Sequence, residues 1–564
     1  MRSLLEGITS TLRSAQQHQT GWDPRNATST GVPTTAQEAF SGGVPAVAQR
    51  DLSHVEGPVS SKGGAPMDCI TGYSRFSTHS PPDFPFRMLM ITQNVGAIGD
   101  TAAGAKEGGE EHRRECEKQA GNDELSSDAQ KDVREFLSEL RLLIFEYSRR
   151  EYTAHIRVSN TGDDDPSHPS AADIGGQGPP PLIDVIVVHF QEIGGKSFHT
   201  EFNNYFANAL QELLPEAGWT SGLLMRTNDD EDQFTAVGSV VYLSHRMCPI
   251  SSILSFHHRT FVCVGDDPVT YGSSPTILFH GGKFSGAGES RKGYLLISLR
   301  LGTVVVNFLN VHLYNDKKSK EAAAASPSPY ALQRQEALLE TLAECAAFIS
   351  PDDPLFIFGD FNTRLDVHNM LQYLKEVENL DVKVSDGDVR APDSFWELFE
   401  NPQHMGVIRP YDVEVQRLLD VVAQQSGMEL AEFAVRFPPT YLCQSPRDSE
   451  EATFQIDTPV HLVNDGEDKR ESGTSDRISV VRVLERLSSM PHHPYGRRRV
   501  PAWCDRVLWN PPALELMTGR RTSQSVAGSS ATAHGGTGVG ALRRYVYRSV
   551  ALRHTDHAAV TLFF

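Results

Sequence analysis

The chain has 564 residues, of which 39% are hydrophobic, and it carries a formal net charge of −20 at pH 7. This length accommodates one large α/β domain with insertions, or several domains of ordinary size. The negative charge argues against a general nucleic-acid binder, because such proteins usually present a basic surface. It does not exclude a small phosphorylated substrate, since a metal ion and a few cations reverse the field within one cleft.

The 7 cysteines are scattered along the sequence, and none belongs to a C-x-x-C pair. Such spacing favours neither a zinc site nor a disulfide framework, and it fits a reducing compartment. No apolar run is long enough to span a bilayer, and the first residues lack the apolar core of a signal peptide. We therefore expect a cytoplasmic protein with no transmembrane segment, and peripheral contact with membranes stays open.

Two kinds of segment alternate along the chain. Residues 1–83 are rich in Gly, Ser, Thr, Pro and Ala, and this composition predicts a disordered N-terminal extension. Residues 84–564 are expected to form one domain. Polar and irregular stretches predict insertions in it near 99–127, 159–181, 443–497 and 518–542.

Apolar runs between these insertions predict strands at 88–92, 182–190, 237–243, 294–300, 303–313, 354–358, 500–509 and 558–564. Helices are expected from Asp128, from Ser328-Pro329 and around 410–425. The first has its apolar side chains on one face, at Val133, Phe136, Leu137, Leu140, Ile144 and Tyr147. Strands outnumber helices, and helices fall between them. This order predicts an α/β (α+β) fold, a two-layered β-sandwich flanked by helices.

Several predicted strands end in polar residues. Such residues are Gln93-Asn94, Gln191-Glu192, His312 and Asp360-Phe361-Asn362. Two further polar stretches, Asp505-Arg506 and Asp556-His557, precede or interrupt late apolar strands. A sheet fixes the backbone, while side chains just past a strand reach into a crevice. In GDFNTRLD, Asp360, Asn362 and Arg364 alternate and so lie on one side of an extended segment. An acid, an amide and a guanidinium there suit a water, a phosphate beside a metal and a substrate anion.

These stretches together resemble a known family. HFQEIGGKSF, NVHLYND, GDFNTRLD, PAWCDRVLW and the closing Asp556-His557 are similar to motifs of inositol polyphosphate 5-phosphatases. Those enzymes belong to the metal-dependent endonuclease/exonuclease/phosphatase superfamily. FTAVGSVVYL, SRKGY and FPPTY most resemble the type I inositol 1,4,5-trisphosphate 5-phosphatase branch. The resemblance runs from about residue 88 to residue 564, and GDFNTRLD with PAWCDR is its most specific part.

The resemblance implies a magnesium site. Glu192 is the expected Mg²⁺ ligand, with Asn94 assisting through its carbonyl oxygen and Asp556 in the inner or outer shell. Mg²⁺ takes oxygen ligands and keeps several waters, so few carboxylates suffice. Taken alone, Glu192 would read as an exposed loop acid and Asn94 as a turn residue.

The resemblance also implies catalytic roles. Asp360 would orient and deprotonate the attacking water, and Asn362 would donate to the transferring phosphoryl group. His312 and His557 would donate to phosphate oxygens, and Asp505 would hold His557 in its protonated form. The alternatives are a turn or cap acid for Asp360 and structural roles for the two histidines.

Substrate binding is expected to depend on cations that hold a multiply charged inositol phosphate. The expected residues are Lys196, Arg291, Lys292, Arg364, Arg497, Arg499 and Arg506. Solvated surface charge is the favoured interpretation for Arg498 and an equal alternative for Arg497.

Two departures from family patterns bear on the substrate. Leu442 follows Tyr441, where many lipid-directed relatives have a Lys for the 4-phosphate, and type I enzymes lack that Lys too. Animal type I enzymes end in a prenylation box, whereas this sequence ends in TLFF, so prenyl attachment is not expected.

The predicted activity is Mg²⁺-dependent removal of the 5-phosphate from inositol 1,4,5-trisphosphate, which ends a calcium-release signal. Inositol 1,3,4,5-tetrakisphosphate is a second candidate substrate. The alternatives are a phosphoinositide lipid 5-phosphatase of the same fold and, with less support, a catalytically inactive scaffold. A nuclease of the same superfamily is disfavoured by the net charge of −20.

Overall fold

The computed structural model describes residues 86–98, 127–159, 183–193, 200–226, 235–264, 278–286, 291–444, 495–519 and 545–564. The predicted extension at 1–83 and nearly all of the four predicted insertions lie outside these residues. Within them, no helix is both long and apolar enough to span a membrane.

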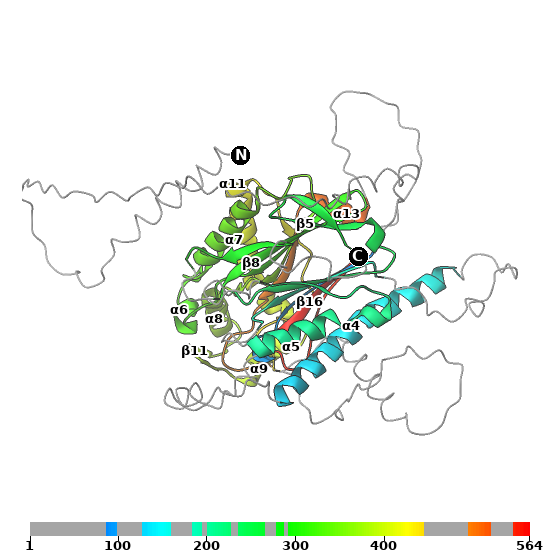
Figure 1. Ribbon diagram of the computed structural model, residues 1–564. Coiled ribbons are helices and arrows are strands. Elements are labelled where there is room, and N and C mark those ends of the chain that lie inside the picture. The colour runs from blue at the N-terminus through cyan, green and yellow to red at the C-terminus, as the bar shows by residue number, and fades with distance from the viewer. Residues whose placement is uncertain are drawn as a thin grey trace, which may run out of the picture. The chain divides into compact units, whose positions relative to one another are not determined.

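Two β-sheets form the centre of the fold (Figure 1). The six-stranded sheet has the order β15-β16-β1-β2-β4-β3, and the eight-stranded sheet has the order β13-β14-β10-β9-β8-β5-β6, with β7 paired to β8. The first comprises β1 (Met88–Asn94), β2 (Val185–Gln191), β3 (Leu223–Arg226), β4 (Gly238–Leu243), β15 (Val546–Ala551) and β16 (Ala558–Phe563). The second comprises β5 (Ser251–Ser255), β6 (Thr260–Cys263), β7 (His280–Lys283), β8 (Gly293–Leu301), β9 (Val304–His312), β10 (Leu355–Asp360), β13 (Ala431–Glu432) and β14 (Asp505–Trp509).

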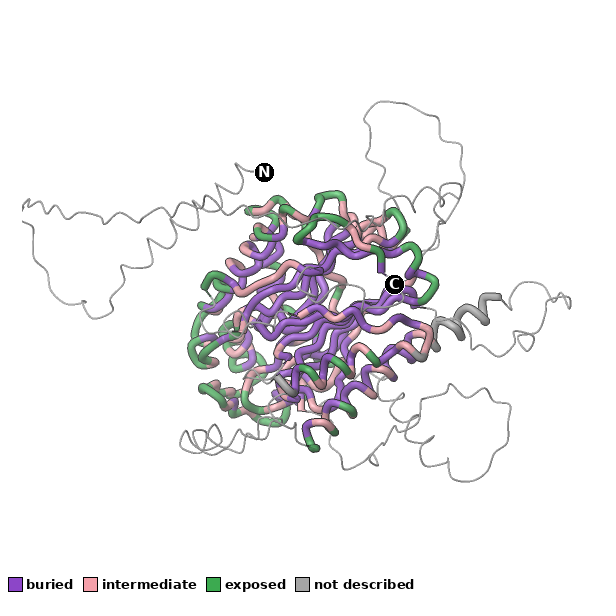
Figure 2. The backbone as a smooth tube through the Cα atoms, viewed as in Figure 1, coloured by how far each residue is buried: buried purple, intermediate pink, exposed green. Residues whose placement is uncertain are grey.

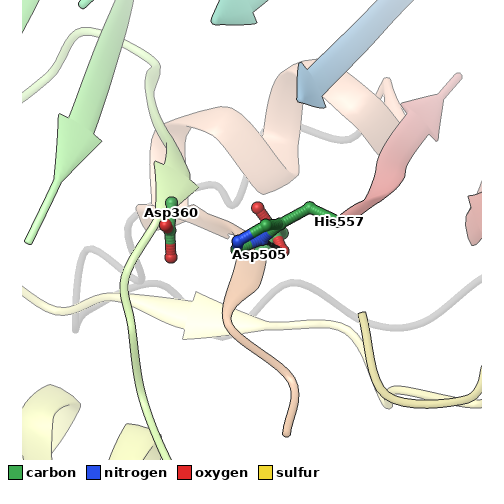
Figure 3. A group of neighbouring side chains, drawn as sticks. All are labelled: Asp360, Asp505 and His557. Carbon is green, nitrogen blue, oxygen red and sulfur yellow. Dashed lines mark hydrogen bonds and ion pairs between the residues drawn. The ribbon is translucent and has the colours of Figure 1, made fainter. Parts of the chain in front are cut away.

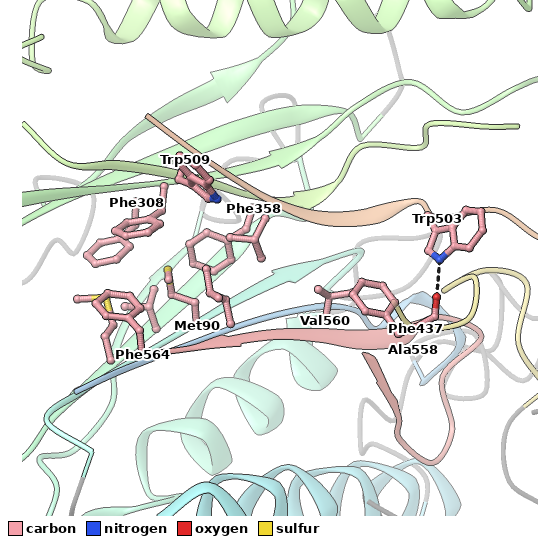
Figure 4. Close-up of a cluster of buried hydrophobic side chains, with 14 of the residues drawn as sticks. Met90, Phe308, Phe358, Phe437, Trp503, Trp509, Ala558, Val560 and Phe564 are labelled. Atoms are coloured by element: carbon pink, nitrogen blue, oxygen red, sulfur yellow. Dashed lines mark hydrogen bonds between the residues drawn. The ribbon is translucent and has the colours of Figure 1, made fainter. Parts of the chain in front are cut away.

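Side chains that alternate along the central strands fill the space between the sheets. Met90 of β1 and Val560 of β16 belong to the same buried cluster as Phe308 of β9 and Phe358 of β10 (Figure 4). Residues of these strands are buried along nearly their whole length (Figure 2). Each fully buried side chain of this size contributes about 1.5–3 kcal/mol relative to exposure. The sandwich is therefore held mainly by its apolar interior.

Helices cover the outer faces of the two sheets. The helices α4 (Ser127–Ser159) and α5 (Thr200–Gln211) pack on the six-stranded sheet, where Phe136 and Phe206 contact Phe190 of β2. The helices α7 (Ala331–Cys345) and α11 (Glu414–Ser426) pack on the eight-stranded sheet. Figure 1 shows the two helix pairs on opposite sides of the strands.

Shorter elements connect these layers. They are α6 (Ser319–Ala323), α8 (Val367–Glu376), α9 (Asp393–Glu400), α10 (Met405–Ile408), α13 (Pro511–Thr518), the hairpin β11 (Lys383–Ser385) with β12 (Asp388–Arg390), and the 3₁₀ turns Pro215–Ala217, Cys248–Ile250 and Arg409–Tyr411. The hairpin and α6 lie next to the site described below.

The predicted two-layered sandwich flanked by helices is confirmed, with two local corrections. The strand predicted at 500–509 begins only at Asp505, because Ala502 pairs with Tyr441 and the Trp503 indole donates to the Phe437 carbonyl (2.9 Å; Figure 4). The helix predicted from Ser328-Pro329 begins at Ala331. Partly exposed strands such as β6 and β7 are not predicted, since they lack a long apolar run.

Gly359, next to the strand end at Asp360, provides a test of this packing. A Cβ at Gly359 would lie 2.1 Å from the Val311 carbonyl oxygen of β9, so the two strands would have to move apart. We expect Gly359→Ala to cost about 1–3 kcal/mol in the free energy of unfolding, measured by urea denaturation.

Gly406 in α10 is the matched control, because nothing lies within 4 Å of a Cβ placed there. Gly406→Ala is expected to be neutral or to stabilise by about 0.4–1 kcal/mol. Equal effects of the two substitutions would contradict the close approach of β9 and β10.

Candidate active site

Strand ends from both sheets meet at one place. In the eight-stranded sheet, Asp360 at the end of β10 lies opposite His312 of β9 and Asp505 of β14. In the six-stranded sheet, Asn94 ends β1, and its Nδ2 donates to Asp360 Oδ2 at 3.1 Å. Residues separated by hundreds of positions in the sequence therefore share one buried site.

Polar side chains between the sheets fix this meeting point. Gln191 Nε2 donates to Asn310 Oδ1 at 2.8 Å, and Asn310 Nδ2 donates to the Gly238 carbonyl at 2.8 Å. His189 stacks on Phe358 and donates through Nδ1 to the Phe358 carbonyl at 3.0 Å. Burial lowers the pKa of His189 to about 3, so this ring is neutral at physiological pH. These contacts join the sheets just below the site.

The Asp360 carboxylate is surrounded by donors. The Asn362 backbone N–H donates to Oδ1 at 2.9 Å, and Asn362 Nδ2 donates to Oδ2 at 3.0 Å. Asn362 has a φ of 51°, a left-handed conformation that Asn adopts more readily than most residues. Burial acts to raise the pKa of Asp360, but His312, His557 and Lys292 together hold it well below its usual range. Asp360 is therefore ionised.

Asp505 and His557 form a buried ion pair beside Asp360 (Figure 3). His557 Nδ1 donates to Asp505 Oδ2 at 2.9 Å, and Thr440 Oγ1 accepts the backbone N–H groups of Cys504 and Asp505 at 3.1 Å each. Burial opposes protonation of His557, but the Asp505 carboxylate outweighs burial and raises the pKa of His557 to about 9. His557 is thus a cation that can donate through Nε2.

His312 has a different environment. Its Nε2 contacts the Lys292 ammonium and lies 3.5 Å from Asp360 Oδ2 and 3.6 Å from Glu192 Oε1. Burial and the adjacent Lys292 lower the pKa of His312. Burial also lowers the pKa of Lys292 to about 8. The two histidines therefore differ, since only His557 is held as a cation.

Glu192, Asn94 and Asp556 are the residues predicted to hold a divalent cation. Glu192 follows β2 with a φ of 60°, packs against Gly96, and its side chain is 23% exposed. Burial raises the pKa of Asp556, and its carboxylate lies close enough to Glu192 and Asp360 for their negative charges to raise that pKa further. Crowded carboxylates and an amide carbonyl are the oxygen donors that Mg²⁺ takes.

A second group could also be considered as a metal site. Ligand atoms of Asp360, Asp505 and His557 all lie within 4.8 Å of one another (Figure 3). In this group His557 Nδ1 is bonded to Asp505 Oδ2, and one of the three ligands would be an imidazole nitrogen. Mg²⁺ takes oxygen ligands, so the oxygen donors at Glu192 stay the predicted site for it.

Two predicted cations lie together in a pocket. Arg364 and Arg499 line a partly open pocket whose other walls include Asp316, Val384 and Val500. Arg364 Nη2 donates to Asn362 Oδ1 at 2.8 Å, and its guanidinium lies 4.8 Å from the centre of the Tyr441 ring. The pocket therefore adjoins the Asp360 site through Arg364 and Asn362.

The other predicted cations are placed differently. Arg291 Nη2 lies 3.3 Å from Glu192 Oε2, beside the site. Arg506 does not line the pocket, contrary to its predicted role, because it is 1% exposed and binds Asp412, Glu432 and the Trp503 carbonyl. Arg497 is exposed and pairs with Asp393 (2.9 Å), which agrees with the surface-charge alternative. Lys196 lies outside the described residues.

Some site residues were not singled out from the sequence. Thr440 orients the Asp505 backbone, the Tyr441 ring centre lies 4.4 Å from that of His557, and Asp316 lines the pocket. All three lie in motifs that carry the family resemblance, FPPTY and NVHLYND. The motifs therefore indicated that these segments lie near the site, but no local pattern indicated which residues these three side chains contact.

The Asp505–His557 pair has a measurable consequence. The His557 pKa, followed by NMR titration, is expected near 9 in the wild type and clearly lower in Asp505→Asn, because the carboxylate that most raises it is removed while burial remains. A raised pKa means that the pair stabilises the fold fully below pH 6.5, and that this contribution is lost as the pH rises through about 9. An unchanged pKa in the variant would contradict the pairing.

Comparison with known proteins identifies the class of enzyme to which the chain is related. No family model matches the sequence. The curated relatives it matches are named inositol 5-phosphatases, which are phosphoric monoester hydrolases, so the predicted family resemblance is confirmed.

One of these relatives is the "Probable type I inositol 1,4,5-trisphosphate 5-phosphatase" of Caenorhabditis elegans, 24% identical over 363 residues that cover 59% of this chain and 83% of the relative. Another is the Homo sapiens "Inositol polyphosphate-5-phosphatase A", 25% identical over 362 residues, or 60% of this chain and 78% of the relative. Among solved structures, the inositol polyphosphate 5-phosphatase domain of a synaptojanin, crystallised with inositol (1,4)-bisphosphate and a calcium ion, matches at 16% identity and a TM-score of 0.35 over 68% of this chain and 75% of that domain.

Proposed function

We propose that this protein is a Mg²⁺-dependent phosphatase of the cytoplasm. It removes the 5-phosphate of inositol 1,4,5-trisphosphate, and also of inositol 1,3,4,5-tetrakisphosphate, and so ends a calcium-release signal. The observation that carries this proposal is the meeting of Glu192, Asp360 and the Asp505–His557 pair at strand ends beside a pocket with two arginines. The names of the curated relatives support the same reaction.

The cationic side chains of the site would bind the substrate. Arg364 and Arg499 would hold the phosphates that are not hydrolysed, through charge-assisted hydrogen bonds. The protonated His557 would donate from Nε2 to an oxygen of the 5-phosphate. Because Asp505 keeps this ring charged and oriented, the donor is in place before negative charge develops in the transition state.

Asp360 would accept a hydrogen bond from the attacking water and aim it at the phosphorus atom. Its low pKa makes it a weak base, but a loose phosphoryl-transfer transition state needs little proton abstraction before the bond to the leaving group breaks. The main contribution of Asp360 is then orientation of the water.

Asn362 acts mainly on Asp360. Its Nδ2 donates to Asp360 Oδ2 at 3.0 Å and to the Leu313 carbonyl at 3.1 Å, so both amide hydrogens are in use. This geometry does not favour the predicted direct donation to the phosphoryl group. Asn362 instead links Asp360 to Arg364, whose guanidinium donates to its Oδ1.

The magnesium ion would be held by Glu192, with Asn94 and Asp556 alongside, and it supplies charge neutralisation for the phosphoryl oxygens. Arg291 and Lys292 lie near Glu192 and limit the repulsion among the site's carboxylates. The site therefore combines fixed anions for the metal with fixed cations for the phosphates.

The alternative substrate is a phosphoinositide in a membrane. Val384, Val500 and Ala322 give the arginine pocket an apolar wall, which a lipid-linked inositol phosphate could contact. The choice between the two substrates is a matter of relative rate and is tested by the same assay as the activity.

The test is product analysis by ion-exchange chromatography with purified protein. Inositol 1,4,5-trisphosphate, the tetrakisphosphate and vesicles with phosphatidylinositol 4,5-bisphosphate are each offered with Mg²⁺ or with EDTA. We expect loss of the 5-phosphate from the soluble substrates with Mg²⁺ only. Equal activity in EDTA would overturn the metal requirement, and a strong preference for vesicles would favour the lipid enzyme. A wild type that binds inositol phosphates without hydrolysing them would favour a scaffold.

A further inference from the structure

A buried charged cluster lies behind the arginine pocket. Its centre is Arg334 of α7, whose side chain is 0% exposed. Arg334 Nη2 donates to Glu414 Oε2 at 2.9 Å, and its Nε also donates to Glu414. Its Nη1 donates to Asp316 Oδ1 at 2.8 Å and to the Tyr314 carbonyl at 3.1 Å. One guanidinium thus joins α7, α11 and the segment that follows β9.

Each pocket arginine is bonded to a residue that Arg334 holds. Glu414 Oε2 accepts the backbone N–H of Arg364 at 3.0 Å. The Asp316 backbone carbonyl accepts Arg499 Nη1 at 3.1 Å. The positions of both arginines therefore depend on the same buried ion pairs, although Arg334 itself does not line the pocket.

The charges of the cluster do not balance internally. One cation, Arg334, faces two carboxylates, Asp316 and Glu414, and leaves one negative charge in a buried region. Arg364, only 7% exposed, lies beside this excess charge, and Asp316 favours its charged form. Buried ion pairs contribute little net stability compared with apolar side chains of similar size. A role in orientation accounts for the cluster better than a role in stability.

We propose that Arg334, Glu414 and Asp316 are positioning residues that set the two pocket arginines for the phosphates the enzyme leaves in place. This inference rests on the proposed function. It concerns affinity for the inositol phosphate rather than the chemical step, so it is tested by binding as well as by turnover. Arg334, Glu414 and Asp316 would then set how much the phosphates that are not hydrolysed contribute to the affinity for a substrate.

The test uses Glu414→Gln and Asp316→Asn, which keep the side-chain shape and remove one negative charge each. Binding of inositol 1,4-bisphosphate, the product of the proposed reaction, is measured by isothermal titration calorimetry and requires no turnover. Plain electrostatics predicts tighter binding of an anion after loss of a nearby negative charge. Positioning predicts the opposite, a loss of affinity of about 5–20-fold in each variant. The KM for the trisphosphate should rise by a similar factor, with kcat within about twofold of the wild type.

Glu432→Gln is the matched control, because Glu432 forms a buried pair with Arg506 and does not line the pocket. Its affinity for the bisphosphate should equal that of the wild type, and denaturation curves report the folding of all variants. Unchanged or tighter binding in Glu414→Gln and Asp316→Asn, or an equal loss in Glu432→Gln, would overturn the inference. A wild type that binds the bisphosphate without hydrolysing the trisphosphate would refute the proposed function and leave this inference standing.

Discussion

Asp360→Asn is expected to lower kcat for 5-phosphate hydrolysis by about 10²-fold or more, because the attacking water loses the acceptor that orients it. In the wild type the carboxylate accepts from Asn94, from the Asn362 backbone and from the Asn362 amide. An amide at this position presents N–H to at least one of these donors and offers the water a poorer acceptor. The measurement is initial phosphate release at saturating substrate and Mg²⁺.

The control for this variant is its affinity for inositol 1,4-bisphosphate, which should change little because Arg364 and Arg499 remain in place. A kcat within about tenfold of the wild type would contradict the role assigned to Asp360. A loss of product affinity comparable to the loss of kcat would instead indicate a damaged pocket.

Glu192→Gln is the substitution with the second largest expected effect. Glu192 is the expected anionic ligand and follows Gln191, which pairs with Asn94 of β1. A neutral amide binds a hard cation more weakly. We expect the Mg²⁺ concentration for half-maximal activity to rise by about 10–100-fold or more, with partial recovery of kcat at high Mg²⁺. Titration of activity with Mg²⁺ measures this shift.

A variant outside the expected set of metal ligands controls for general effects of lost charge. Glu340→Gln removes an acid on the outer face of α7 that bonds Ser285. It should leave the Mg²⁺ dependence unchanged. If Glu192→Gln also leaves it unchanged, the metal is not held where we place it.

Much of the fold followed from local patterns. The runs at 88–92, 303–313 and 354–358 are apolar on both faces, because the sheets are covered by helices outside and by each other inside. Strands of this kind can be predicted from the sequence, because they form continuous apolar runs. The edge strands β6 and β7 cannot, because they are partly exposed and gain their structure from pairing with β5 and β8.

The candidate site could be predicted as a set of residues but not as a set of contacts. Asp360, Asp505 and His557 were expected together, and Figure 3 shows them side by side. Arg506 was predicted to bind the substrate because its motif carries a cation. In the structure, however, Arg506 forms ion pairs with Asp412 and Glu432. Those acids are 94 and 74 residues away in the sequence, and no local spacing connects them to Arg506.

The contacts of Asn362 could also be predicted only in part. Alternation placed it beside Asp360 and Arg364, and the structure agrees. Its second amide hydrogen is used by Leu313, at the end of the neighbouring strand, which only the pairing of β9 with β10 brings near. The residue was found by pattern, whereas its partners depend on tertiary packing.

A crystal structure with Mn²⁺ in place of Mg²⁺ and with inositol 1,4-bisphosphate would show whether the metal and the inositol phosphate share this site, since anomalous scattering locates the metal. We expect one metal peak at the Glu192 carboxylate, and an inositol ring between the Asp505–His557 pair and the Arg364–Arg499 pocket. A metal bound between Asp360, Asp505 and His557, or an inositol phosphate bound away from both arginines, would contradict this expectation.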